Sequence, residues 1–169
     1  MSQELREKVA KQIEEAFADA PYPGDENIGW GCGSEGGMLE EAFRGKHWSE
    51  LSLELILDNR DKLPCTTPEG FRFYMPAWLL AALLHYEMPK AYDLCQSLIF
   101  NLCPQDDSAM QEHFLRHIAK FNAQEKAAVL AFLEAWKELH PDEIEMEVIL
   151  PARLRKLSLA LAFWKNPAL

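Results

Sequence analysis

The sequence predicts an all-α fold, a compact bundle of about seven to nine helices around one buried helix near residues 76–87. Three observations lead to this fold class. Apolar residues recur every three or four positions through most of the chain, which is the period of an α-helix. Prolines and helix-capping residues separate these segments at short intervals. One segment, residues 143–150, alternates apolar and polar residues as a strand does, but no second strand of similar quality is available to pair with it.

The first expected helix covers residues 2–19, and Pro21 and Pro23 end it. Its inward stripe consists of four apolar residues spaced by four: Leu5, Val9, Ile13 and Phe17. Residues 20–37 follow as the longest irregular segment, a loop that holds most of the glycines. A loop of this length in a compact domain is either functional or mobile.

Shorter helices are expected near residues 38–44, where Gly45 ends the helix, and near residues 48–58. Farther along the chain, Pro89 opens a helix that runs to about Leu102.

The central segment of the chain combines a helix start with its most apolar stretch. Either Thr66 or Thr67 can cap a helix whose first position is Pro68. Pro76 has no amide proton to donate to the helix, so it should interrupt it. We therefore expect a short helix at 68–74, a kink or break, and then the buried central helix, which is apolar nearly all round.

The sequence of the last third of the chain predicts two amphipathic helices, an irregular segment and a final helix. Ser108 is the expected cap of the first, whose inward residues are Met110, Phe114, Ile118 and Phe121. Asn122 and Glu125 form a capping box for the second, which runs to about Leu139 and turns inward Val129, Phe132, Leu133 and Trp136. Residues 143–150 are expected to form a loop or extended arm, and a basic helix follows near 151–165.

Composition fits a single domain over residues 1–169 that can bury a core without disulfides or metals. The formal net charge is −10, which argues against binding to a nucleic-acid backbone. Residues 151–169 carry four basic and no acidic side chains, so residues 1–150 carry −14. Such an acidic surface suits a basic protein partner and also serves solubility. No cofactor is expected.

The four cysteines, Cys32, Cys65, Cys95 and Cys103, lie far apart and include no Cys-x-x-Cys pair. With no secretory signal at the start of the sequence, we expect reduced thiols and a cytoplasmic location. The apolar central helix is shorter than the roughly 20 residues that cross a bilayer, so no membrane role is expected.

Four short motifs resemble an uncharacterised bacterial family, a domain of unknown function. They are Ala16-Phe17, residues 23–28 (Pro-Gly-Asp-Glu-Asn-Ile), residues 43–48 (Phe-Arg-Gly-Lys-His-Trp) and residues 67–77, which contain Thr-Pro-Glu-Gly-Phe-Arg-Phe-Tyr-Met-Pro-Ala. The resemblance covers roughly residues 13–86. It implies a compact, mostly helical protein and no established activity. The glycine-rich segment 29–37 departs from the family pattern.

Two histidines and one cysteine are the residues that could carry chemistry. His113 and His117 stand four apart, a spacing at which two imidazoles on one helix can share a metal. The sequence provides no third ligand near them, and His117 falls within the apolar stripe, so a packed, hydrogen-bonded histidine is the alternative. Cys65, just before a helix start, is the best placed thiol for reactivity, but no histidine partner is evident.

Five residues are candidates for contact with a partner: Glu69, Arg72, Tyr74, Trp48 and Trp30. Arg72 lies among aromatic residues and can stack on a ring or bind a carboxylate of a partner. The alternative is an internal ion pair, with Glu69 three residues earlier as one possible acid, that clamps the start of the central helix.

Two functions are compatible with these features. The first is a noncatalytic interaction protein, such as an inhibitor, an immunity-type protein or an adaptor, which binds a partner protein through its acidic surface. The second is a small hydrolase-type or metal-dependent enzyme that uses His113 or His117. The absence of a recognisable catalytic motif favours the first function, and the oligomeric state is left open.

Overall fold

The computed structural model describes residues 2–30, 34–150 and 155–166, and over these residues the chain forms α-helices joined by turns and loops. Nine α-helices lie within these ranges: α1 (Ser2–Phe17), α2 (Ser34–Phe43), α3 (Leu53–Asp58), α4 (Pro68–His85), α5 (Pro89–Asn101), α6 (Ser108–Ile118), α7 (Ala123–Leu139), α8 (Pro141–Val148) and α9 (Lys156–Trp164). Three short 3-10 helices accompany them: η1 (Asp25–Asn27), η2 (Trp48–Glu50) and η3 (Leu63–Cys65). The predicted all-α fold is confirmed.

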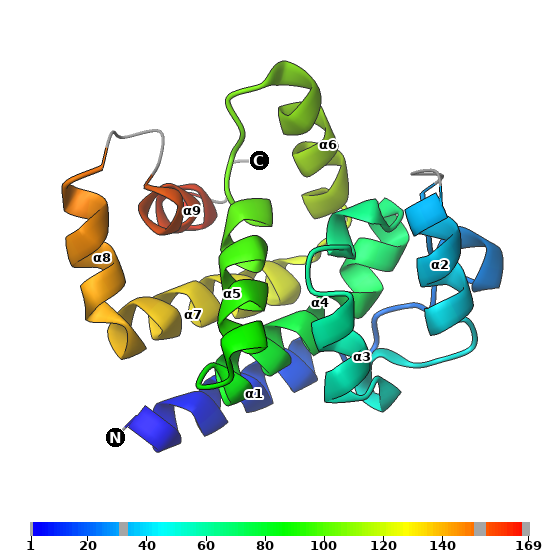
Figure 1. Cartoon of the computed structure of the whole chain (residues 1–169), viewed down its shortest axis with the longest axis horizontal. Coiled ribbons are helices and arrows are strands. Elements are labelled where there is room, and N and C mark those ends of the chain that lie inside the picture. The colour runs from blue at the N-terminus through cyan, green and yellow to red at the C-terminus, as the bar shows by residue number, and fades with distance from the viewer. Residues whose placement is uncertain (1, 31–33, 151–154, 167–169) are drawn as a thin grey trace.

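Helix α4 is the centre of the structure, as the apolar sequence of its second half predicts. It packs against α1, α5, α6 and α7, while α2 and α8 lie at opposite ends of the molecule (Figure 1). Trp78 of α4 is fully buried, and its indole nitrogen donates to the Arg60 carbonyl at 3.2 Å. In the described part of the chain, no helix is both long and apolar enough to span a membrane.

The expected division into two helices, 68–74 and 76–87, is wrong, because α4 continues without a break from Pro68 to His85. Pro76 does remove one amide donor, which would destabilise an isolated helix by about 3 kcal/mol or more. Here Pro76 is itself buried, and so are residues 73–75 before it and 77–79 after it. Packing on all sides of the helix offsets the missing hydrogen bond.

Residues 143–150 also differ from expectation, because most of them belong to α8 rather than to a loop or extended arm. Two acids four residues apart, Glu143 and Glu147, face the rest of the protein. Glu143 accepts a hydrogen bond from the Trp136 indole at 3.0 Å, and Glu147 accepts from the amide of Leu157 at 2.7 Å. The inward face of α8 is therefore partly acidic, so its hydropathy does not show the helical period.

Several helix boundaries lie away from the expected ones. Helix α2 starts at Ser34, so the end of the expected loop at 20–37 is helical. The helix expected near 48–58 is divided into η2 and α3 by Ser52, which caps α3. Asp107 rather than Ser108 caps α6, and Met110 on that helix is exposed rather than inward. The final helix starts at Lys156; residues 151–154 of the expected basic helix lie outside the described residues.

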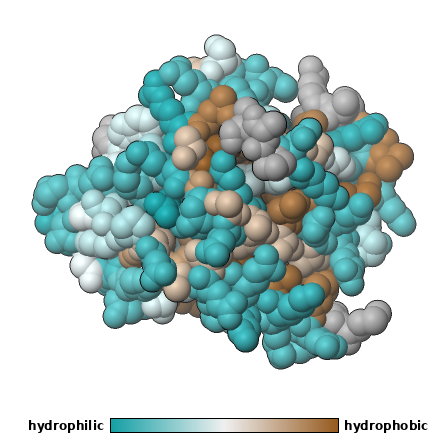
Figure 2. Space-filling model, turned by 180° about the vertical axis from the view of Figure 1, so that it is seen from behind, coloured by the Kyte–Doolittle hydropathy of each residue, from teal (hydrophilic) through white to brown (hydrophobic). Residues whose placement is uncertain are grey.

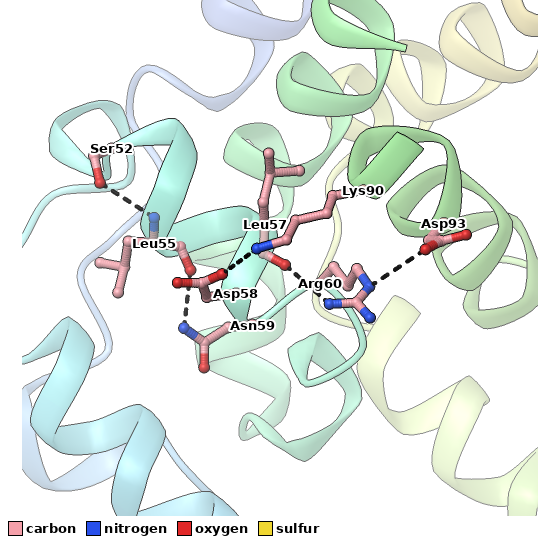
Figure 3. Close-up of polar contacts among 8 residues, drawn as sticks. All are labelled: Ser52, Leu55, Leu57, Asp58, Asn59, Arg60, Lys90 and Asp93. Atoms are coloured by element: carbon pink, nitrogen blue, oxygen red, sulfur yellow. Dashed lines mark hydrogen bonds and ion pairs between the residues drawn. The ribbon is translucent and has the colours of Figure 1, made fainter. Parts of the chain in front are cut away.

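Polar contacts join α3 and the turn after it to the start of α5 (Figure 3). Lys90 binds Asp58 at 2.9 Å, and the Arg60 guanidinium lies 4.0 Å from Asp93 while also donating to the Leu57 carbonyl. These four charged side chains are between 36% and 63% exposed, so solvent screens the pairs and they contribute little to stability.

Candidate functional site

Three sequence-predicted residues, Trp30, His113 and His117, come together at the start of α4. The centre of the Trp30 ring lies 5.3 Å from that of His113, with the two rings nearly parallel at 17°, and 5.6 Å from that of His117. Trp30 remains 37% exposed, whereas His117 is buried. The cluster therefore extends from the core to the surface.

Backbone pairing brings Trp30 to this position. The Trp30 amide donates to the Cys65 carbonyl at 2.8 Å, and the Thr67 amide donates to the Ile28 carbonyl at 2.9 Å. Gly70 makes this approach possible, because a Cβ atom there would lie 2.7 Å from the Ile28 carbonyl oxygen. Thr67 adds its own links: its hydroxyl donates to the Asn27 carbonyl and accepts from the Gly70 amide, which confirms it as the cap of α4.

His117 fastens α6 to the segment before α4. Its Nδ1 lies 2.8 Å from the His113 carbonyl oxygen and its Nε2 lies 2.9 Å from the Thr66 carbonyl oxygen. Both neighbours are acceptors, and a neutral imidazole has one N–H to donate. The packed, hydrogen-bonded alternative predicted for His117 is the one that the structure shows.

His113 is half-buried and stands between His117 and Trp30. Burial lowers the pKa of the His113 imidazole, and the neighbouring charges of His117 and Arg116 lower it further, while a hydrogen bond with the Pro64 backbone acts in the opposite direction. The neutral form of His113 therefore dominates near pH 7. A neutral ring stacks on Trp30 without the desolvation cost of a charge.

An apolar hollow of about 430 Å³ opens beside the two histidines, between α5, α6 and residues 64–65. Its largest apolar lining residues are Phe71, Phe100, Met110 and Phe114. Polar groups on its wall include Cys65, Asn101 and Gln105. A volume of this size and an apolar wall with a few polar groups are typical of sites that bind small molecules or anchoring side chains.

A metal site at His113 and His117 has no support from the described residues, since no group of three or more His, Cys, Asp or Glu side chains that could hold a metal ion is found among them. His117 also uses both ring nitrogens in contacts with carbonyl oxygens. His113 and Cys65, by contrast, line the same hollow, a proximity that the sequence did not reveal.

Arg72 forms an internal ion pair, but its partner is Glu125 rather than Glu69. Its Nε lies 2.9 Å from both carboxylate oxygens of Glu125, whose side chain is 1% exposed. Glu69 instead binds Lys120 at 2.6 Å, and this bond is the largest cause of the lowered pKa of Glu69. The sequence predicts a structural role for Glu125, as part of the capping box of α7, but no sequence pattern pairs Glu125 with Arg72.

The other two predicted contact residues, Tyr74 and Trp48, lie in the core. Tyr74 is fully buried, and its hydroxyl lies 3.2 Å from the Phe43 carbonyl oxygen; burial raises its pKa well above the usual value. Trp48 is 7% exposed, and its buried indole nitrogen has no hydrogen-bond partner among the described residues. Neither side chain is accessible to a partner in this structure.

Comparisons with known proteins identify the sequence family of the chain. No curated protein matches the chain, and no solved structure does. A family model does match, over residues 5–168, and so covers nearly the whole sequence, well beyond the segment that carries the four short motifs. The chain belongs to a family of unknown function (DUF6714).

Proposed function

We propose that this protein is a noncatalytic interaction protein, an adaptor, inhibitor or immunity-type protein, and that a partner protein inserts an apolar side chain into the hollow beside His113. The observation that carries the proposal is the apolar hollow itself, which opens at the surface next to a half-exposed tryptophan. Interface energy is commonly concentrated where one anchor residue fills such a pocket.

The rim of the hollow has the composition of a contact surface. Phe100 is 39% exposed and Met110 47% exposed, and Trp30 stands behind His113 with 37% of its surface exposed. Tryptophan, phenylalanine and methionine are enriched at protein interfaces. The formal net charge of −10 favours a partner whose contact surface is basic, and it disfavours nucleic acid.

A cytoplasmic location fits the buried thiols. Burial raises the pKa of Cys95 well above its usual value and that of Cys103 to about 11, so both remain protonated and unreactive near pH 7. Both are free thiols in the structure. Reduced cysteines that serve as core residues are typical of the cytoplasm.

The experiment is affinity purification from the native host with the wild-type protein and two alanine-to-tryptophan variants. Ala109→Trp fills the hollow, because Ala109 lines it. Ala162→Trp is the control, because Ala162 is equally a small exposed helical residue but does not line this hollow. We expect the wild type and Ala162→Trp to retain one stoichiometric partner that Ala109→Trp loses. Recovery of no partner, or of the same partner with all three proteins, contradicts the proposal.

An enzyme of the hydrolase type is the second candidate, favoured by one observation: His113, Cys65 and Asn101 line the same hollow. A neutral histidine can act as a base toward a thiol or a water molecule. Hydrolysis of p-nitrophenyl esters of increasing chain length by the wild type, with loss of activity in His113→Gln, would support this candidate. Equal rates for both proteins would remove it.

A further inference from the structure

Helix α8 and the residue after it expose several large hydrophobic side chains to solvent. Three residues on and just after it are the most exposed large hydrophobic residues of the described chain: Met146 at 61%, Val148 at 65% and Ile149 at 75%. The space-filling view from behind shows a hydrophobic patch at the right edge of the molecule, where α8 lies (Figure 2). Exposed hydrophobic residues that lie next to one another indicate an interaction surface.

The patch borders a groove. A hollow of about 520 Å³ lies between α5, α8 and the start of α9, and Met146, Tyr92 and Phe100 are among the residues that line it. Tyr92 is 44% exposed. Phe100 lines both this hollow and the one beside His113, so the two adjoin across α5.

The charged side chains around this groove indicate the charge of the partner that it binds. Helix α8 carries four acids and no base, and two of these acids, Glu143 and Glu147, are occupied by hydrogen bonds within the protein. The other two, Asp142 and Glu145, are exposed and form no ion pair within the described ranges. By helical spacing they lie on the same outward face as Met146 and Ile149. Lys156 also lines the groove, with its Nζ 5.1 Å from the centre of the Phe100 ring, so the α9 side is basic.

We propose that this α5–α8 groove binds a basic amphipathic helix of a partner protein, whose apolar face covers Met146 and whose Lys or Arg residues meet Asp142 and Glu145. An amphipathic helix in an apolar groove is a recurring mode of recognition. A second copy of the same chain fits poorly, because α8 against α8 would bring like charges together. An anionic membrane surface is disfavoured for the same reason. This inference rests on the proposed interaction function and names the partner class.

The test uses two fluorescein-labelled 14-residue peptides, LKKLLKLLKKLLKL and its counterpart with Glu in place of every Lys, and measures fluorescence anisotropy at low and physiological salt. We expect the full-length protein to bind the Lys peptide at least tenfold more tightly than the Glu peptide, with weakening as salt rises. Equal affinity for both peptides overturns the assignment of a basic partner.

Matched variants locate the binding. Met146→Ser combined with Ile149→Ser should weaken binding of the Lys peptide about tenfold, because both apolar contacts are lost. Asp142→Asn combined with Glu145→Gln should weaken it several-fold more than a control pair, Glu41→Gln combined with Glu54→Gln. The control makes the same change in net charge on α2 and α3, away from α8 (Figure 1). An equal loss in the two charge variants means attraction to net charge alone and overturns the proposal.

Two further outcomes separate this inference from the proposed function. If light scattering shows a dimer that the Met146→Ser and Ile149→Ser pair converts to a monomer, a second copy covers the groove and the proposal is wrong. If Ala109→Trp abolishes capture of the native partner while the α8 variants bind that partner normally, the function at the His113 hollow stands and the α5–α8 groove is not its contact surface.

Discussion

The guanidinium of Arg72 on α4 lies within 2.9 Å of both carboxylate oxygens of Glu125 at the start of α7, a pair separated by 53 residues in the chain. The same carboxylate accepts the Asn122 amide at 2.8 Å, so one buried acid caps α7 and binds α4. Its side chain is 1% exposed, whereas that of Arg72 is 23% exposed. Arg72 thus compensates the charge of an acid that water barely reaches.

Arg72→Ala should therefore destabilise the protein by about 3 kcal/mol, because removal of one partner leaves a buried carboxylate uncompensated. Urea unfolding followed by circular dichroism measures this change. Glu69→Gln is the control: its pair with Lys120 is about half exposed, so its loss should cost at most about 1 kcal/mol. An Arg72→Ala protein that unfolds like the wild type but no longer captures its partner would make Arg72 a recognition residue instead.

Gly70→Ala tests the close approach that positions Trp30. The added Cβ would meet the Ile28 carbonyl oxygen at 2.7 Å, so the pairing of residues 28–30 with residues 65–67 must shift. We expect a loss of stability of about 1–3 kcal/mol, within the range of other steric changes in a core. Thr67→Ala, which removes the cap but adds no atoms, should cost about 1 kcal/mol.

Gly70→Ala and Thr67→Ala should also differ in their tryptophan fluorescence. Intrinsic fluorescence from Trp30 should change in Gly70→Ala, since its stacking on His113 depends on the shifted segment. The signal is isolated by comparison with Trp30→Phe. If Gly70→Ala matches the wild type in both stability and fluorescence, the segment adjusts freely and Trp30 is not held by this contact.

The fold could be predicted because it depends on local sequence patterns. Most of the features that the sequence did not predict depend on contacts between residues far apart in the chain. The caps at Thr67 and Asn122 and the inward faces of α1 and α7 depend on residues three or four apart, so they could be read directly. The partner of Arg72 lies 53 residues away, and no local pattern identifies it. The stacking of Trp30 on His113 is likewise a product of tertiary packing.

Two of the predicted contact residues show a further limit. Tyr74, from the aromatic-rich block at 71–74, and Trp48, from the segment at 43–48, are predicted to contact a partner, yet both lie in the core. An aromatic side chain has the same sequence signature in both places, because it combines apolar area with one polar group. Whether the polar group finds a partner inside does not separate the two places either: the Tyr74 hydroxyl donates to the Phe43 carbonyl, whereas the buried Trp48 indole nitrogen has no partner among the described residues.

The lowered pKa of His113 makes stability depend on pH. Its folded-state pKa is below the value of about 6.5 for an unfolded histidine, so between these two values the unfolded chain binds more protons than the folded one. Stability should therefore fall as the pH decreases through about 6.5 and below. The lowered pKa of His140 acts in the same direction.

His113→Gln removes one of these two contributions. Unfolding free energies measured at pH 7.5 and pH 5.5 should differ less for His113→Gln than for the wild type. His140→Gln serves as the positive control, because burial is likewise the largest cause of its shift. Identical pH dependence in the wild type and His113→Gln would show that His113 is not sequestered from solvent in its neutral form.

Two tryptophans with equal exposure allow the contribution of an indole hydrogen bond to stability to be measured apart from the contribution of burial. Trp48 and Trp164 are both 7% exposed, but the Trp164 nitrogen donates to the Leu102 carbonyl at 2.7 Å while that of Trp48 has no partner among the described residues. Trp164→Phe should cost about 1–3 kcal/mol more than Trp48→Phe, because it leaves a buried carbonyl without its donor, whereas no described residue accepts from the Trp48 nitrogen and its removal leaves no such carbonyl unpaired. Urea unfolding of the two single variants measures the difference. Equal losses would mean that the Trp48 indole nitrogen has a hydrogen-bond partner in solution. NMR detection of a water molecule bound at that nitrogen would then identify the partner.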